Sequence, residues 1–316
     1  MPDNIYENLK NNIRQKAKAG SGFGNRQKSK VRGRPKPSRN VPPGDQERID
    51  IVSTLRSAAP WQKLRKQQLK LSKNIILLDG GIGQEIYKRA HSPDSHTLWS
   101  LKIMIDNPDL VIKVHQDFIA SGARVLSLNN YAATPSRLKK IGMYSSFGEM
   151  HQVAIKLLKL AIDKSPISRA DIKVAGSLPP LVASYTSHDE RPHKDLYDEY
   201  ISLIDQQIND VDLFLAETLS STKEILAVTD ALQFYSLKKY ISLTLDDKSP
   251  LKLRSGELLM DAVKLLKDRC ADVILINCSR PETVSIALPI LKNSGIVFGA
   301  YANGFSSVEK LEPGKN

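Results

Sequence analysis

Short apolar runs alternate with longer amphipathic runs from residue 71 onward. The apolar runs are often β-branched and lack polar alternation, which is typical of strands buried on both faces. They fall at 74–79, 124–129, 173–177, 211–216, 239–245, 272–277 and 296–301. Helical runs lie between most of them, at 108–121, 147–164, 195–209, 221–234, 256–268 and 281–292. Repeated βα units predict an α/β fold with a parallel sheet, either doubly wound or closed as a (β/α)8 barrel of the TIM type.

The first long helix has clear end signals. Asn107 supplies a capping side chain and Pro108 follows at the first helical position, while Gly122 provides the stop. The segment Asp79-Gly80-Gly81-Ile82-Gly83 contains G-x-G, but it lacks the third glycine of a dinucleotide-binding fingerprint. The pattern therefore does not favour nucleotide binding.

Polar residues follow every predicted strand. In a parallel barrel the carboxyl ends of the strands form the active-site face, so these residues predict a functional rim. The alternative is that polar residues follow strands simply because loops are exposed to solvent. The rim positions are Asp79-Gly80-Gly81, Asn129-Asn130-Tyr131, Gly176-Ser177, Glu217-Thr218, Asp246-Asp247, Asn277-Cys278 and Tyr301-Ala302-Asn303.

Charge is distributed unevenly along the 316 residues. The formal net charge is +12, and residues 1–70 hold 17 Lys and Arg against 5 Asp and Glu, which accounts for all of it. The remaining residues are charge-balanced, so a nucleic-acid or membrane partner is not indicated for them. No apolar run reaches the roughly 18–20 residues that span a bilayer, and no secretory signal is recognisable. We therefore expect no membrane partner. The presence of only two cysteines favours a reducing cytoplasm.

Residues 1–70 are predicted to form a basic, largely disordered arm with a short helix near 48–59, preceding a folded body at 71–316. Residues 30–37 resemble an AT-hook, which lays Arg-Gly-Arg into an A·T minor groove. A DNA-associated protein is therefore one alternative, and a solvated basic linker is another. Residues 30–65 weakly resemble the linker of magnesium-chelatase D-type subunits. No DxSxS metal-site motif follows, so no chelatase activity is implied.

Eight ordered motifs in the body resemble the homocysteine S-methyltransferase family. The resemblance covers about residues 75–313 and implies a (β/α)8 barrel. The motifs are ILLDGGIGQEI (76–86), LWS (98–100), NPDLVIKVHQDFIASGARVLSLNNYAATPSRL (107–138), GSLPP (176–180), LFLAETLSSTKE (213–224), LRSGELL (253–259), ILINCSRPE (274–282) and YANGF (301–305).

The resemblance implies an enzyme that transfers a methyl group from a donor to the thiol of homocysteine, giving methionine. The family uses zinc held by protein thiolates, which keeps the substrate sulfur as a thiolate. The donor is not readable from the sequence. On this resemblance the substrate-binding positions are Asp79, Gly80, Gly81, Tyr131, Glu217, Thr218 and Asn277, and the metal-binding position is Cys278.

Each of these positions also has a purely structural interpretation. Cys278 alone is compatible with a packed cysteine at a strand end, because free cysteines are among the most buried residues. Glu217 is compatible with a structural ion pair to a lysine, and Asp79 with the capping of a loop. The family context favours the functional interpretation, with Glu217 holding the amino group of the substrate.

The family's two other zinc cysteines, in a Gly-Gly-Cys-Cys segment, are missing from the printed sequence. We therefore expect a barrel truncated before its eighth strand, with doubtful activity or a catalytically inactive amino-acid-binding role. Cys270 precedes the strand that Cys278 ends, so it lies too far away to share a metal or a disulfide. His188 and His193 are weak alternative ligands. The unpaired strand edges predict a homo-oligomer or poor solubility.

Overall fold

The computed structural model describes residues 75–90, 99–186 and 188–303. The elements below all lie in one compact unit that includes Leu77–Asn316. The predicted arm at 1–70, with its helix near 48–59 and its AT-hook-like segment, lies outside the described residues. None of the helices in the described ranges is long and apolar enough to cross a membrane.

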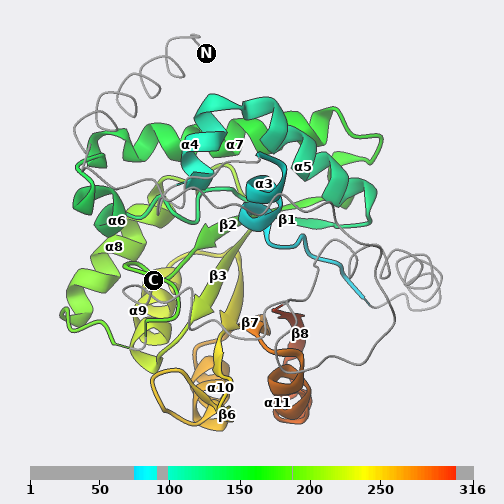
Figure 1. Ribbon diagram of the computed structural model, residues 1–316. Coiled ribbons are helices and arrows are strands. Elements are labelled where there is room, and N and C mark those ends of the chain that lie inside the picture. The colour runs from blue at the N-terminus through cyan, green and yellow to red at the C-terminus, as the bar shows by residue number, and fades with distance from the viewer. Residues whose placement is uncertain (1–74, 91–98, 187, 304–316) are drawn as a thin grey trace, which may run out of the picture. The chain divides into compact units, whose positions relative to one another are not determined.

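Six parallel strands form one curled sheet in the order β1-β2-β3-β4-β7-β8, visible at the centre of Figure 1. The strands are β1 (Val125–Ser127), β2 (Lys173–Leu178), β3 (Leu213–Leu219), β4 (Lys238–Leu243), β7 (Val273–Ser279) and β8 (Val297–Ala302). Each of the six coincides with a predicted run to within a few residues. The observed architecture is therefore a mixed α/β fold with a parallel half-barrel.

The predicted strand at 74–79 is wrong as a full strand. In the described residues it is reduced to a parallel bridge between Leu78 and Val125, next to a hydrogen bond of 2.9 Å from Asp79 N to Val125 O. In the described residues this segment pairs with β1, which is three residues long and also pairs with β2. A strand as short as β1 supports only a short ladder of backbone hydrogen bonds.

The predicted run at 239–245 divides into two elements. After β4 the chain forms a hairpin of β5 (Leu245–Asp246) and β6 (Ser249–Leu253), which pair antiparallel. The Asp246 side chain accepts a hydrogen bond of 2.8 Å from Lys248 N, an Asx turn that reverses the chain.

In the described residues all six predicted helices are present, together with three α-helices that were not predicted. The predicted set is α5 (Pro108–Ala120), α7 (Phe147–Asp163), α8 (His193–Asp205), α9 (Thr222–Leu232), α10 (Leu259–Asp268) and α11 (Pro281–Asn293). The additional helices are α3 (Ile82–Ala90), α4 (Trp99–Asp106) and α6 (Pro135–Lys140). All three are shorter than ten residues, so their periodicity is weak in the sequence.

The capping signals of α5 are confirmed. The Asn107 side chain accepts a hydrogen bond of 3.3 Å from Leu110 N, and Pro108 is the first helical residue. Gly122 follows the helix with φ +108°, a left-handed conformation that strains a residue carrying a Cβ. Local sequence alone therefore determined both ends of this helix.

Both faces of the sheet are buried in apolar side chains from β1 to β7. One cluster takes alternate residues from β1, β2, β3, β4 and β7 and includes Val125, Leu213 and Leu275. The intervening residues, such as Phe214 and Ile274, pack into the large cluster shared with the helices. This double burial confirms the interpretation of the runs that form β1, β2, β3, β4 and β7. The interpretation is wrong for the run at 296–301, because β8 is exposed along most of its length, and Ile75 and Ile76 of the first run are exposed as well.

Candidate functional site

The carboxyl ends of β3 and β7 meet although β4 lies between them in the sheet. Thr218 N donates to Asn277 Oδ1 at 3.1 Å, and Asn277 Nδ2 donates to Thr218 Oγ1 at 2.9 Å. The Sγ atom of Cys278 lies 3.5 Å from Asn277 Nδ2 and 3.9 Å from Thr218 Oγ1. The curl of the sheet thus brings three predicted site residues into direct contact.

Backbone strain is concentrated at the same place. Among the described residues, four that are not glycine have positive φ, and three of them are Tyr185 at 64°, Thr218 at 62° and Cys278 at 51°. The Tyr185 hydroxyl hydrogen-bonds to Cys278, so all three meet around the thiol. Such conformations cost of order 1–3 kcal/mol each and gather at functional sites. Strain thus marks the end of β7 independently of any motif.

Glu217 lies at the end of β3 beside Ser177 of β2. Ser177 Oγ donates to Glu217 Oε1 at 2.5 Å. Burial raises the pKa of Glu217 to about 7, while the hydrogen bond from Ser177 and the charge of Arg137 act in the opposite direction. No lysine pairs with Glu217 in the described part of the chain, so the structural ion pair considered from the sequence is absent there. A half-buried carboxyl of this kind suits a cationic ligand group.

Asp79 connects the first loop to β1. Its two carboxylate oxygens accept hydrogen bonds of 2.7 Å from Ser127 N and Ser127 Oγ. Burial raises the pKa of Asp79 to about 8, partly offset by these bonds. Both Asp79 oxygens therefore hold Ser127 of β1 and connect the first loop to the sheet.

The glycines after Asp79 lie against aromatic side chains. Gly81 N donates to Tyr301 Oη at 3.2 Å, and this hydrogen bond links the loop after Asp79 to β8. A Cβ at Gly80 would lie 3.1 Å from Cε1 of Phe118, closer than most Cβ contacts. A larger residue at Gly80 therefore requires the Phe118 ring to move.

Tyr131 follows β1 and reaches the loop between β2 and α8, residues 179–192, which we call the β2–α8 loop. Tyr131 Oη lies 2.7 Å from Ser184 Oγ, and the Arg137 guanidinium lies 5.1 Å from the Tyr131 ring centroid. Burial raises the pKa of Tyr131 to about 12, so its hydroxyl is protonated at neutral pH. Tyr131 therefore carries no charge at the site.

Cys278 is half-buried beside a cation. Burial raises the pKa of the Cys278 thiol. Hydrogen bonds from Tyr185 and Thr218, and the charge of Arg254, act to lower it. The Arg254 guanidinium lies 4.9 Å from the Tyr185 ring centroid and 3.5 Å from Asp247 Oδ2. Cys278 is accordingly a thiol rather than a thiolate at neutral pH.

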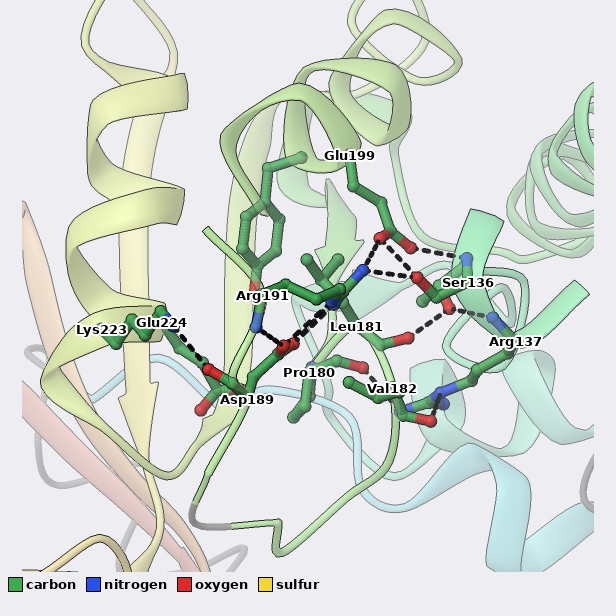
Figure 2. Close-up of polar contacts among 12 residues, drawn as sticks. Ser136, Arg137, Pro180, Leu181, Val182, Asp189, Arg191, Glu199, Lys223 and Glu224 are labelled. Carbon is green, nitrogen blue, oxygen red and sulfur yellow. Dashed lines mark hydrogen bonds and ion pairs between the residues drawn. The ribbon is translucent and has the colours of Figure 1, made fainter. Parts of the chain in front are cut away.

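The β2–α8 loop is held by ion pairs that sequence reasoning missed. Arg191 Nη2 lies 2.5 Å from Asp189 Oδ2 and Arg191 Nη1 lies 2.6 Å from Glu199 Oε2. Lys223 Nζ of α9 donates to Asp189 O at 2.5 Å. Figure 2 shows Arg191 between Asp189 and Glu199, with Lys223 approaching from α9.

Other partners of the site were also not singled out. Ser127, Tyr185, Arg137 and Arg254 come from separate parts of the chain and meet the predicted residues only in the folded structure. Ser177 was named as a rim residue, without its contact to Glu217. The sequence offered one indication that Arg137 belongs to the site, namely its position in the NNYAATPSRL part of the 107–138 motif.

In the described residues no group of three His, Cys, Asp or Glu side chains is arranged to hold a metal ion. Cys270 and Cys278 are not disulfide-bonded, and Cys270 is exposed. His193 pairs with Asp230 at 3.0 Å and His188 is exposed. His115 and His151 are buried within α5 and α7.

Comparison with known proteins identifies the family. The model of the homocysteine S-methyltransferase family matches residues 76–315. Homocysteine S-methyltransferase of Escherichia coli (strain K12) is 29% identical over 238 residues, which is 68% of this chain and 73% of that protein. Homocysteine S-methyltransferase 2 of Arabidopsis thaliana is 24% identical over 272 residues, covering 77% of this chain and 80% of that protein.

A second resemblance is also confirmed. The magnesium-chelatase 60 kDa subunit of Rhodobacter capsulatus is 41% identical over 95 residues, 30% of this chain. The chain spans only 17% of that protein's length, so its activity does not transfer.

A solved structure supports the fold. The crystal structure of the metallated homocysteine methyltransferase MmuM from Escherichia coli superimposes with a TM-score of 0.62 at 22% identity, covering 75% of this chain and 94% of that one. With the family model matching three quarters of the sequence, this chain belongs to the homocysteine S-methyltransferase family, a family of methyltransferase enzymes.

Proposed function

We propose that this chain transfers a methyl group to the thiol of homocysteine, giving methionine. The family membership supports this activity. The observation that carries it is the convergence of Thr218, Asn277 and Cys278 at the adjoining ends of β3 and β7. A small amino-acid substrate also suits a body in which basic and acidic residues balance.

In this proposal Glu217 binds the ammonium group of homocysteine. Its carboxyl is half-buried, and Ser177 occupies one of its oxygens, leaving the other available to the ligand. A charge-assisted hydrogen bond to the carboxylate is stronger than a neutral one. We assign substrate contacts to Asp79, Gly80, Gly81, Tyr131, Thr218 and Asn277 as well.

Zinc is the cofactor that the family resemblance implies, with Cys278 as one ligand. When bound, it would hold the substrate sulfur as a thiolate. The described residues do not fit a three-ligand zinc site, because Cys278 is the one cysteine at the rim and no cluster of three ligand side chains is present there.

Several further proposals concern the whole chain. We propose that the half-barrel belongs to a TIM-type (β/α)8 barrel, preceded by a basic arm at 1–70. The parallel bridge between Leu78 and Val125, which extends the sheet beyond β1, supports this arrangement. We propose a cytoplasmic location, which the two free cysteines support. A homo-oligomer through the strand edges is also proposed.

The test is methyl transfer by the purified full chain. The protein is incubated with homocysteine and, separately, S-methylmethionine, betaine or a methylfolate, and methionine is quantified by mass spectrometry. We expect methionine with at least one donor and at least a tenfold lower yield for Glu217→Gln. The control variant Glu282→Gln changes an exposed residue of α11 and should match the unaltered chain. No methionine with any donor, together with no homocysteine binding, would reject the proposal.

A further inference from the structure

Arg137 is a buried cation with an unusual set of partners. It lies in α6 and is 8% exposed. Its guanidinium donates to three backbone carbonyls: Tyr131 O at 3.1 Å, Pro180 O at 2.6 Å and Val182 O at 3.3 Å. Among the described residues no carboxylate lies within ion-pair distance of it. A buried charge is costly, so its retention with neutral acceptors calls for an explanation.

These contacts join two loops at the active-site end of the sheet. One acceptor is on the segment that follows β1, and two are on the β2–α8 loop. Figure 2 shows the Arg137 side chain extended toward Pro180 and Val182. The planar guanidinium places several N–H donors in one rigid fork, which a lysine ammonium cannot reproduce.

The same guanidinium lies over the ring of Tyr131, and Tyr131 in turn contacts the loop that Arg137 holds. The centroid distance is 5.1 Å, and Tyr131 Oη is 2.7 Å from Ser184 Oγ. The contacts therefore close a cycle from Arg137 through Tyr131 and Ser184 back to Val182. Loss of Arg137 would release both the Tyr131 hydroxyl and the loop that carries Tyr185.

We propose that Arg137 is a positioning residue for the homocysteine site, acting through Tyr131 and the β2–α8 loop. This inference rests on the proposed function for its ligand, but its structural part is independent of that ligand. The charge of Arg137 also counteracts the rise in the pKa of Glu217, the proposed ammonium-binding residue. Arg137 itself is not assigned a contact with the substrate.

Arg191 provides the matched control. It is also an arginine holding the β2–α8 loop, but its partners are carboxylates and the Ser136 hydroxyl. No hydrogen bond joins Arg191 to Tyr131 in the described structure. Arg137→Lys and Arg191→Lys therefore each remove a guanidinium that holds the β2–α8 loop, and only the first removes the link to Tyr131.

The first measurement is a double-mutant cycle on homocysteine binding by isothermal titration calorimetry, with Tyr131→Phe as the second change. We expect Arg137→Lys to weaken binding at least tenfold and Tyr131→Phe to add little to it, because both disrupt one unit. Arg191→Lys should combine additively with Tyr131→Phe. Additive effects in both cycles, or unchanged affinity in Arg137→Lys, would overturn the proposal.

The second measurement uses the ligand-free chain and separates this inference from the proposed function. Hydrogen exchange followed by mass spectrometry should show several-fold faster exchange in peptides covering both 130–133 and 180–184 for Arg137→Lys. Arg191→Lys should leave the 130–133 peptide unchanged. If the unaltered chain binds no homocysteine, the proposed function fails, and the positioning role of Arg137 is then judged from hydrogen exchange alone. Unchanged hydrogen exchange in Arg137→Lys would reject the positioning role.

Discussion

Individual residues at the carboxyl ends of the strands determine the chemistry available to this chain. Glu217 has a raised pKa, and Ser177 donates to one of its two carboxyl oxygens. Thr218 and Cys278 are held in left-handed conformations that the surrounding hydrogen bonds impose. The site is therefore pre-arranged by its neighbours rather than by the intrinsic preferences of its own residues.

Homocysteine binding should depend on pH through Glu217. Burial raises the pKa of Glu217 to about 7, so the carboxylate that pairs with an ammonium group forms as pH rises through that value. We expect affinity to weaken up to about tenfold from pH 8 to pH 6, since one pH unit below a pKa leaves about a tenth of an acid ionised.

Titration calorimetry at four pH values would check this expectation. Glu217→Gln should bind weakly with a flat profile over the same range, and Glu282→Gln should retain the profile of the unaltered chain. A profile that is equally steep in Glu217→Gln would assign the dependence to another group.

Zinc content is a second property set by individual residues. The described residues place one cysteine, Cys278, at the rim, and a structural or catalytic zinc needs at least three protein ligands. We expect elemental analysis of the purified full chain to find well below one zinc per chain, unchanged in Cys278→Ser. A stoichiometric zinc that disappears in Cys278→Ser would contradict this expectation.

At the scale of single elements, the start of α9 shows how local sequence and burial interact. Ser221 caps the helix by accepting a hydrogen bond of 3.2 Å from Glu224 N, and Glu224 Oε2 accepts one of 2.8 Å from Ser220 N. This S-x-x-E pattern is a recognisable capping box. What the sequence could not reveal is the burial of Glu224, which raises its pKa to about 7.

The buried Glu224 should make the stability of the fold depend on pH. Because its folded pKa is raised above its usual 4.5, its contribution is fully present below that pH and is lost as pH rises through about 7. The difference between a pKa of 4.5 and one of about 7 corresponds to a loss of about 3 kcal/mol, at about 1.4 kcal/mol per pKa unit.

Urea unfolding at pH 5 and pH 8 would measure this loss. The variant Glu224→Gln should show a smaller decrease in unfolding free energy between the two pH values than the unaltered chain. Asp261→Asn, which changes an acid in the first turn of α10, is the control that should retain the decrease. An equal decrease in Glu224→Gln would contradict the expectation.

At the scale of the whole molecule, β8 is the outermost strand on its side of the sheet in the described residues. Val297 is 69% exposed and Phe298 is 40% exposed, although both belong to a strand whose neighbour β7 is buried. An outer strand with apolar side chains is a template for association.

We expect the full chain to self-associate in a concentration-dependent way in light scattering after size-exclusion chromatography. Val297→Lys combined with Phe298→Lys should shift the mass toward that of a monomer. Phe234→Lys replaces a side chain that is 74% exposed beyond α9, and it should have no effect. A monodisperse monomer for the unaltered chain, with cooperative melting, would contradict the proposed oligomer.

The sequence by itself determined the order and kind of most elements, because buried parallel strands and amphipathic helices leave strong local patterns and caps such as Asn107 act within a few residues. It also indicated the family and the strand ends that carry Glu217, Thr218 and Cys278. Only the tertiary structure decided which side chains meet, as Arg137 with Tyr131 and Tyr185 with Cys278 show. Contacts between distant segments depend on the curl of the sheet and on burial, and neither is encoded in a local pattern.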